Sequence, residues 1–178
     1  LYLLVGFTLE FFITRISIEK EQWIWEKINI SSKFISTNDD LEEEQEYVEA
    51  VFDKIPESIK PKGYNFTITV SDKEDPNAFA VPGGNIVVTK GLLDTLETEN
   101  ALLFVLGHEL GHFKNRDHLR GMGFGLTTTL LAVVLSGQES GIAEAASGLI
   151  NIGSLSYSRK QEREADQIGL ETSYAVYG

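Results

Sequence analysis

The spacing of apolar side chains predicts helices in the middle and last thirds of the chain, with short strands between them. Over residues 39–55 these side chains recur at three- and four-residue intervals, which is typical of a helix with one buried face. Asn38 or Asp39 can cap this helix, and Pro56 follows it. Residues 64–70 then alternate between apolar and polar side chains, which predicts a strand.

Two more extended segments are predicted at residues 78–81 and 85–89, separated by a Pro-Gly-Gly turn. A short helix over 91–96 leads into a longer one over 98–114, with Thr98 as its cap. The longer helix is apolar on all sides near its start. We therefore expect it to be central and buried.

Two apolar stretches of the chain, one at its start and one between the HExxH motif and the last helix, could lie either in a membrane or in a soluble domain. Residues 1–13 are almost wholly apolar, so they are either the end of a membrane span or a helix packed on the core. Residues 122–157 predict two small-residue helices, each below the roughly 18 residues of a span, which favours a soluble hairpin. A charged helix is predicted over 159–174. We therefore divide the chain into an apolar helix with an amphipathic connector, 1–30, and a domain, 31–178, and we expect that domain to continue beyond residue 178.

Composition and charge exclude several classes of protein. The 178 residues are 42% hydrophobic and 24% charged, which is typical of one globular domain. Acidic residues outnumber basic ones by 27 to 15, giving a net charge of −12. This charge repels phosphate backbones, so we expect no nucleic-acid partner. The chain has no cysteine, which excludes a disulfide framework and a thiolate metal site.

The sequence His-Glu-Leu-Gly-His lies at residues 108–112, inside the predicted central helix. Side chains four residues apart lie about 5–6 Å from each other on one helix face. His108 and His112 can therefore bind one zinc ion at about 2.0–2.1 Å. Glu109 lies about 100° around the helix and can instead take a proton from water that the metal activates. Polar groups in a buried helix are costly, which favours a metal site over coincidence.

A catalytic zinc ion needs a third protein ligand, and the chain offers two candidates. His118 follows His112 by six residues, as in the HExxHxxGxxH pattern of metzincins, and Asn115 tolerates the left-handed turn which that pattern needs. Metzincins also need a methionine turn well downstream, and Met122 is too close. The second candidate is Glu162.

Glu162 and Asp166 lie one turn apart on the predicted charged helix. Glu162 would complete the His₂Glu ligand set of gluzincins, and Asp166 could accept a hydrogen bond from the outer nitrogen of a bound imidazole. Alone, this stretch is typical of a solvated helix face. Beside an HExxH motif with no other good third ligand, the metal interpretation is favoured, and His118 becomes a polar residue at the helix exit.

Three motifs, taken in their order along the chain, resemble those of family forty-eight of the metallopeptidases. They are HELGH at 108–112, SRKQEREAD at 158–166 and NAFAVPGGNI at 77–86, and the resemblance covers about residues 39–175. It implies an α+β fold, a mostly helical zincin-like domain of the gluzincin type. The expected fold has a small sheet of about three strands and a central HExxH helix.

The resemblance also implies a role for each site residue. His108, His112 and Glu162 would bind one Zn²⁺ ion per chain, with Glu109 as catalytic base and Asp166 as support for an imidazole. An extended substrate would lie along an edge strand formed by Asn77, Ala78, Phe79 and Ala80, although core packing is an equal alternative for Phe79. A His or Arg that stabilises the oxyanion in the family is expected beyond the last helix.

Together these features predict a zinc metalloendopeptidase that hydrolyses peptide bonds of protein substrates in membrane-associated quality control. The expected location is the cell envelope, at the inner membrane or in the periplasm, with the cytoplasm as an alternative. The other candidate is a catalytically weak or inactive zinc-bearing module that binds unfolded or membrane proteins. The sequence indicates neither the natural substrate nor the oligomeric state.

Overall fold

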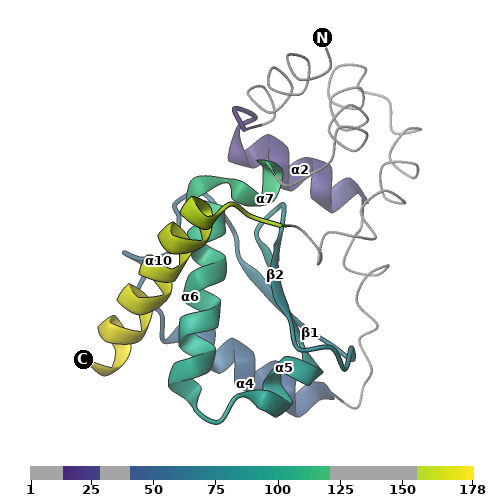
Figure 1. The fold of residues 1–178 in the computed structure, drawn as a ribbon. Helices are drawn as coiled ribbons and strands as arrows, with labels where there is room; N and C mark the ends of the chain where they lie inside the picture. The colour runs from purple at the N-terminus through teal and green to yellow at the C-terminus, as the bar shows by residue number, and fades with distance from the viewer. Residues whose placement is uncertain (1–13, 29–40, 121–155) are drawn as a thin grey trace.

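The computed structural model describes residues 14–28, 41–120 and 156–178 (Figure 1). The predicted N-terminal apolar helix and the small-residue hairpin lie outside these residues. The helices are α2 (Ile18–Ile28), α4 (Glu42–Asp53), α5 (Lys90–Thr95), α6 (Glu99–Asn115), α7 (Asp117–Arg120) and α10 (Arg159–Tyr177). The strands are β1 (Thr67–Ser71), β2 (Ala78–Val81) and β3 (Asn85–Thr89). A mostly helical α+β fold with a small three-stranded sheet is thus confirmed for the described part of the chain.

The three strands form one sheet in the order β1-β3-β2, with β1 parallel and β2 antiparallel to β3. A tight turn joins β2 to β3, and its Gly83 and Gly84 have φ angles of 92° and 98°. A side chain at Gly84 would also meet the Asn65 carbonyl oxygen at 2.6 Å, so only glycine fits there. Because the strand order is β1-β3-β2, β2 lies at an edge of the sheet, and it contacts α6.

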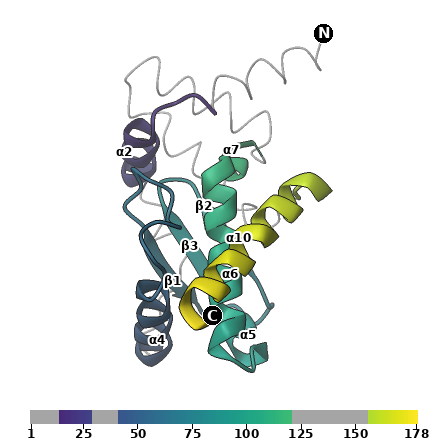
Figure 2. The ribbon, with the colours of Figure 1, turned by 90° about the vertical axis from the view of Figure 1, so that its left-hand side faces the viewer.

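The HExxH helix α6 lies between the sheet and α10 (Figures 1 and 2). Thr98 caps α6 as predicted, because its hydroxyl accepts a hydrogen bond from the Ala101 N–H at 3.2 Å. Leu102, Leu103 and Leu106 are buried and join the hydrophobic core. The same core holds buried side chains from α4 and from all three strands, so α6 is packed on both sides.

Small residues let α10 approach α6 closely. A Cβ atom at Gly111 of α6 would lie 2.6 Å from the Cα atom of Ala165 on α10, and one at Gly107 would lie 3.0 Å from the Cα atom of Gly169. Two glycines of α6, four residues apart, therefore face two small residues of α10 that are also four residues apart. The backbones of the two helices are in direct contact there. This contact brings the start of α10 to the motif on α6.

The N-terminal helix α2 packs against the rest of the domain. Ile24 and Trp25 are buried, and the carboxylate of Glu21 is only 2% exposed. Four groups from the body of the domain donate to that carboxylate: Tyr64 Oη, Gly83 N–H, Arg116 Nη2 and His118 Nε2, at 2.6–2.9 Å. The segment predicted as an amphipathic connector is thus a helix anchored through a buried acid.

Three predicted boundaries need correction. The helix predicted over 39–55 runs from Glu42 to Asp53 with Leu41 at its N-cap position, and the predicted cap residues Asn38 and Asp39 lie outside the described residues. The predicted strand over 64–70 is paired only from Thr67 to Ser71, because its partner β3 begins at Asn85, directly after the glycine turn. The last helix continues to Tyr177 instead of ending at residue 174.

Candidate metal centre

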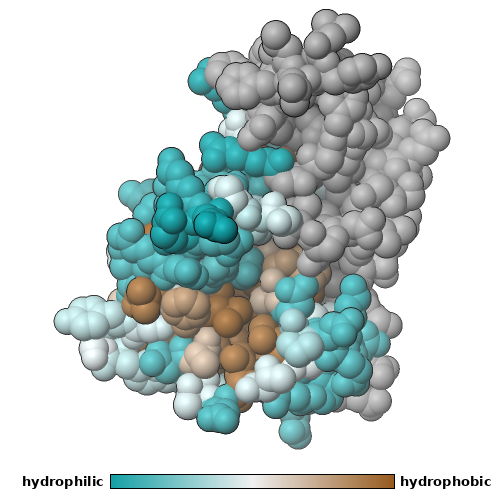
Figure 3. Space-filling model, viewed as in Figure 1, coloured by the Kyte–Doolittle hydropathy of each residue, from teal (hydrophilic) through white to brown (hydrophobic). Residues whose placement is uncertain are grey.

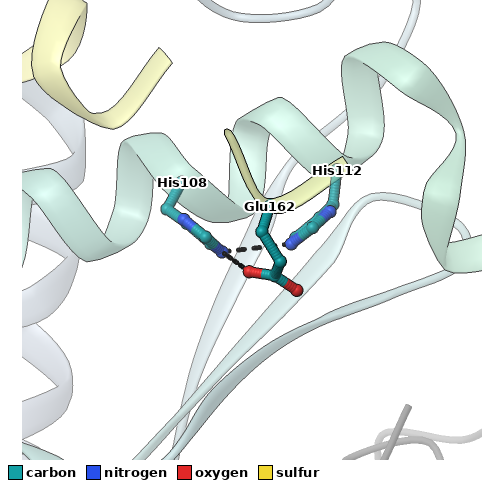
Figure 4. A group of neighbouring side chains, drawn as sticks. All are labelled: His108, His112 and Glu162. Atoms are coloured by element: carbon teal, nitrogen blue, oxygen red, sulfur yellow. Dashed lines mark hydrogen bonds and ion pairs between the residues drawn. The ribbon is translucent and has the colours of Figure 1, made fainter. Parts of the chain in front are cut away.

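Two imidazoles and one carboxylate converge between α6 and α10. The Nε2 atoms of His108 and His112 are 3.1 Å apart, and Glu162 Oε2 lies 3.5 Å from His108 Nε2. One ligand atom from each of the three side chains lies within 4.8 Å of the others. Figure 4 shows the three side chains pointing toward one another, two from α6 and one from the first turn of α10.

The two separations that involve His108 fit a tetrahedral metal ion. Ligand atoms about 2.0–2.1 Å from a zinc ion lie about 3.3 Å from one another, close to the 3.1 and 3.5 Å separations found here. Two imidazole nitrogens and a carboxylate are also a donor set that zinc accepts. Within the described residues this is the one group of three or more such side chains that could hold a metal ion.

Each imidazole has a carboxylate at its outer nitrogen. His108 Nδ1 lies 3.0 Å from Asp166 Oδ1, and His112 Nδ1 lies 3.3 Å from Asp117 Oδ2. A neutral imidazole that donates from Nδ1 keeps the lone pair of Nε2 available. Both rings are therefore arranged to present Nε2 to a metal.

Asp117 was not among the residues that the sequence predicted for the site. It is fully buried, and Gln161 Nε2 donates to its Oδ1 at 2.7 Å. Burial alone would raise its pKa, but the hydrogen bonds from His112 and Gln161 outweigh burial and lower it. Asp117 reaches His112 because the chain turns back at Arg116, whose φ is +57°. The left-handed residue is thus Arg116, where the metzincin pattern suggested Asn115, and residue type gives no signal for it.

Glu109 lies beside the ligands but faces the sheet. Its side chain is 5% exposed, and the Ala80 N–H of β2 is among the groups that favour its charged form. Burial raises its pKa, although the neighbouring His112 and His108 oppose the rise. The carboxylate is therefore a stronger base than one in water.

His118 does not join the ligand group. It is fully buried, its Nε2 lies 2.9 Å from Glu21 Oε1, and its Nδ1 lies 3.3 Å from the His112 carbonyl oxygen. Because both ring nitrogens have partners away from the convergent atoms, the metzincin alternative is wrong. The ring stacked on the site is Tyr157, whose centroid lies 4.0 Å from that of His112.

The edge strand β2 presents part of its backbone beside Glu109. The Thr89 N–H donates to the Asn77 carbonyl oxygen at 2.9 Å, which marks that pair as hydrogen-bonded. Because such pairs alternate along an antiparallel ladder, the N–H and C=O groups of Ala78 and Ala80 point away from β3. Phe79 is half-buried, and Ala80 is buried in the core.

The fold and the convergent residues are those of a metallopeptidase. The chain belongs to peptidase family M48, whose family model matches residues 42–177. This finding confirms the resemblance noted from the three motifs, and it implies a catalytic metal.

Similar proteins carry peptidase names. The mitochondrial metalloendopeptidase OMA1 of Schizosaccharomyces pombe is 34% identical over 96 residues, covering 53% of this chain and 28% of the relative. A protease HtpX homolog of Thermoplasma acidophilum is 33% identical over 118 residues, covering 56% and 37%. A putative beta-barrel assembly-enhancing protease of Vibrio cholerae is 27% identical over 139 residues, covering 71% and 28%. The chain thus spans well under half the length of these relatives.

The search for a membrane-crossing segment is negative for the described residues. None of the helices that they form combines the length and the apolar character that a membrane span requires.

Proposed function

We propose that this chain is the peptidase unit of a zinc-dependent metalloendopeptidase of the gluzincin type, with one zinc ion per chain. The observation that carries the proposal is the convergence of His108, His112 and Glu162, with buried Glu109 next to them. When bound, zinc would polarise a carbonyl group and make water nucleophilic near neutral pH. Asp166 would support His108 through its outer nitrogen.

Glu109 would act as the catalytic base. Its burial raises its pKa, although the Ala80 N–H favours the charged form. The carboxylate would take a proton from the attacking water and give that proton to the leaving amine. One water molecule is consumed, the C–N bond breaks, and the carboxylate is restored.

A protein or peptide substrate would bind in extended form along β2, at the segment from Asn77 to Ala80. An edge strand can pair with a backbone of any sequence. The pairing groups would be the N–H and C=O groups of Ala78 and Ala80, which point away from β3. A hydrophobic patch over α6 and the adjacent parts of α10 and β2 (Figure 3) offers a surface for apolar side chains of an unfolded chain.

The biological setting that we propose is membrane-associated protein quality control in the cell envelope. It rests on family membership and on relatives named as a metalloendopeptidase, a protease homolog and a putative beta-barrel assembly-enhancing protease. The net charge of −12 supports a protein substrate over a nucleic acid.

The test measures cleavage of unfolded casein and zinc content in the same samples. We expect cleavage that a chelator stops and zinc restores. Glu109→Gln should abolish cleavage while zinc content stays at about one ion per chain. Glu171→Gln, which changes an exposed carboxylate of α10, is the matched control and should cleave at the parent rate.

Two results would contradict the proposal. Cleavage at the parent rate by the Glu109→Gln variant would show that another group is the base. Stoichiometric zinc without any cleavage of casein, combined with casein binding, would favour the zinc-bearing binding module instead.

A further inference from the structure

Asp117 is a carboxylate placed where a charge is costly. It is fully buried, at the junction of α6 and α7, and a buried charge persists only when its oxygens are well partnered. Arg120 Nη1 lies 3.4 Å from Oδ1, and the Arg120 side chain is 44% exposed. The short contacts of Asp117 go to the two elements that carry the metal-ligand candidates.

The two oxygens of Asp117 have different partners. Oδ2 lies 3.3 Å from His112 Nδ1, and Oδ1 accepts from Gln161 Nε2 at 2.7 Å. Gln161 directly precedes Glu162 in the first turn of α10. One buried carboxylate therefore connects the second histidine of α6 with the turn that carries Glu162.

Gln161 is itself held in one orientation. Its Oε1 accepts the N–H of Ser158 at 2.9 Å, and the Ser158 hydroxyl accepts the N–H of Gln161, which together form a capping box. With Oε1 occupied by the cap, only Nε2 can face Asp117. The amide therefore requires an acceptor at Asp117 Oδ1.

We propose that Asp117 is a positioning residue for the metal centre, acting on His112 directly and on Glu162 through Gln161. It fixes the His112 tautomer with Nε2 available and secures the first turn of α10 against the end of α6. The proposal rests on the proposed zinc site but concerns a residue outside the ligand set. Its counterpart at the other histidine is the Asp166–His108 contact.

Asp117→Asn tests this role with almost no change in size. Asn has one acceptor and one donor group, whereas His112 Nδ1–H and Gln161 Nε2 both need an acceptor. At least one contact must therefore break. We expect the dissociation constant for zinc to rise about 10–100-fold. We also expect a changed absorption spectrum of the Co²⁺-substituted protein, because the ligand geometry changes.

The measurement is zinc competition against a chromophoric chelator at fixed pH, together with thermal unfolding of the metal-free variants. Asp94→Asn, at an exposed carboxylate of α5 that pairs with Lys90, is the matched control. The inference is overturned if Asp117→Asn binds zinc within twofold of the parent or leaves the Co²⁺ spectrum unchanged. A parent chain that binds no zinc would contradict the proposed function as well. Failure of the inference alone would leave zinc binding by the parent chain intact, so the two failures are distinguishable.

A second pair of variants serves where Asp117→Asn does not fold. Gln161→Met removes both the contact with Asp117 and the side-chain half of the cap, whereas Ser158→Ala removes only the serine half. We expect Gln161→Met to weaken zinc binding at least fivefold more than Ser158→Ala does. Equal effects of the two variants would assign the role to the helix cap and overturn the inference.

Discussion

The contact between α6 and α10 can be tested by adding one methyl group at Gly111. A Cβ atom there would lie 2.6 Å from Ala165 Cα and 3.1 Å from Ala165 Cβ. Carbon atoms in contact normally lie about 3.5–4.0 Å apart, so the helices would have to separate by about 1 Å. Since the nearest atom belongs to the backbone, no side-chain rotation relieves the clash.

The energetic cost of Gly111→Ala has two opposing terms. Alanine is favoured over glycine inside a helix by about 1 kcal/mol, whereas overpacking costs about 1–3 kcal/mol. A backbone clash belongs at the upper end of that range, so we expect a net loss of about 2 kcal/mol. In a chain of this length this corresponds to a melting temperature about 4–8 °C lower.

The same shift should weaken metal binding. Metal–ligand distances tolerate deviations of about 0.2 Å, so a displacement of about 1 Å carries Glu162 out of range. We expect Gly111→Ala to lose stability in thermal unfolding and zinc affinity in chelator competition. Gln167→Ala, on the exposed face of α10, is the control and should change stability by less than about 0.5 kcal/mol. A Gly111→Ala variant as stable as the parent with full zinc affinity would refute the close packing of the two helices.

Three further predictions follow from single contacts. Burial raises the pKa of Glu21, but His118, the Gly83 N–H and Arg116 outweigh burial and hold that pKa below the ordinary value of 4.5. The stabilisation is therefore complete above pH 4.5 and is lost as the pH falls through the lower folded value. Glu21→Gln should therefore cost about 2 kcal/mol at neutral pH and, in urea unfolding at several pH values, lose less further stability in acid than the parent; an equal loss would contradict the assignment. Asp166→Ala should weaken zinc binding about 10–100-fold in chelator competition, because His108 loses its acceptor; unchanged affinity would contradict that contact. Thr98→Ala should cost about 1 kcal/mol in urea unfolding through the lost cap of α6, whereas Thr98→Ser should retain most of it, and equal losses would contradict the cap.

The elements that the sequence predicted well are those with complete local signals. The strands at residues 78–81 and 85–89 match their predicted bounds, because a Pro-Gly-Gly turn separates two apolar runs. α6 begins at its predicted cap, since Thr98 stands directly before an apolar helix. In each case the deciding information lies within a few residues.

The features that sequence analysis missed depend on contacts between distant segments. Glu21 looks like a solvent-exposed acid of an amphipathic helix, yet it is buried by partners 43–97 positions away. Asp117 reaches His112 only because Arg116 adopts a left-handed conformation that any prediction from residue type disfavours. Neither position carries a local pattern that indicates burial.

The position of Glu162 depends on packing more than on its local sequence. Its side chain is 44% exposed, and solvent alone would leave such a carboxylate free to move. It reaches His108 because α10 is held along α6 by small residues and at its first turn by the Gln161–Asp117 contact. A metal ion held by His108, His112 and Glu162 would therefore bind more tightly when α10 is docked on α6 than when it is undocked. By linkage, each tenfold increase in the ratio of zinc concentration to its dissociation constant should stabilise the docked state of α10 by about 1.4 kcal/mol. Conversely, a change that makes docking less favourable should make the free energy of zinc binding less favourable by the same amount.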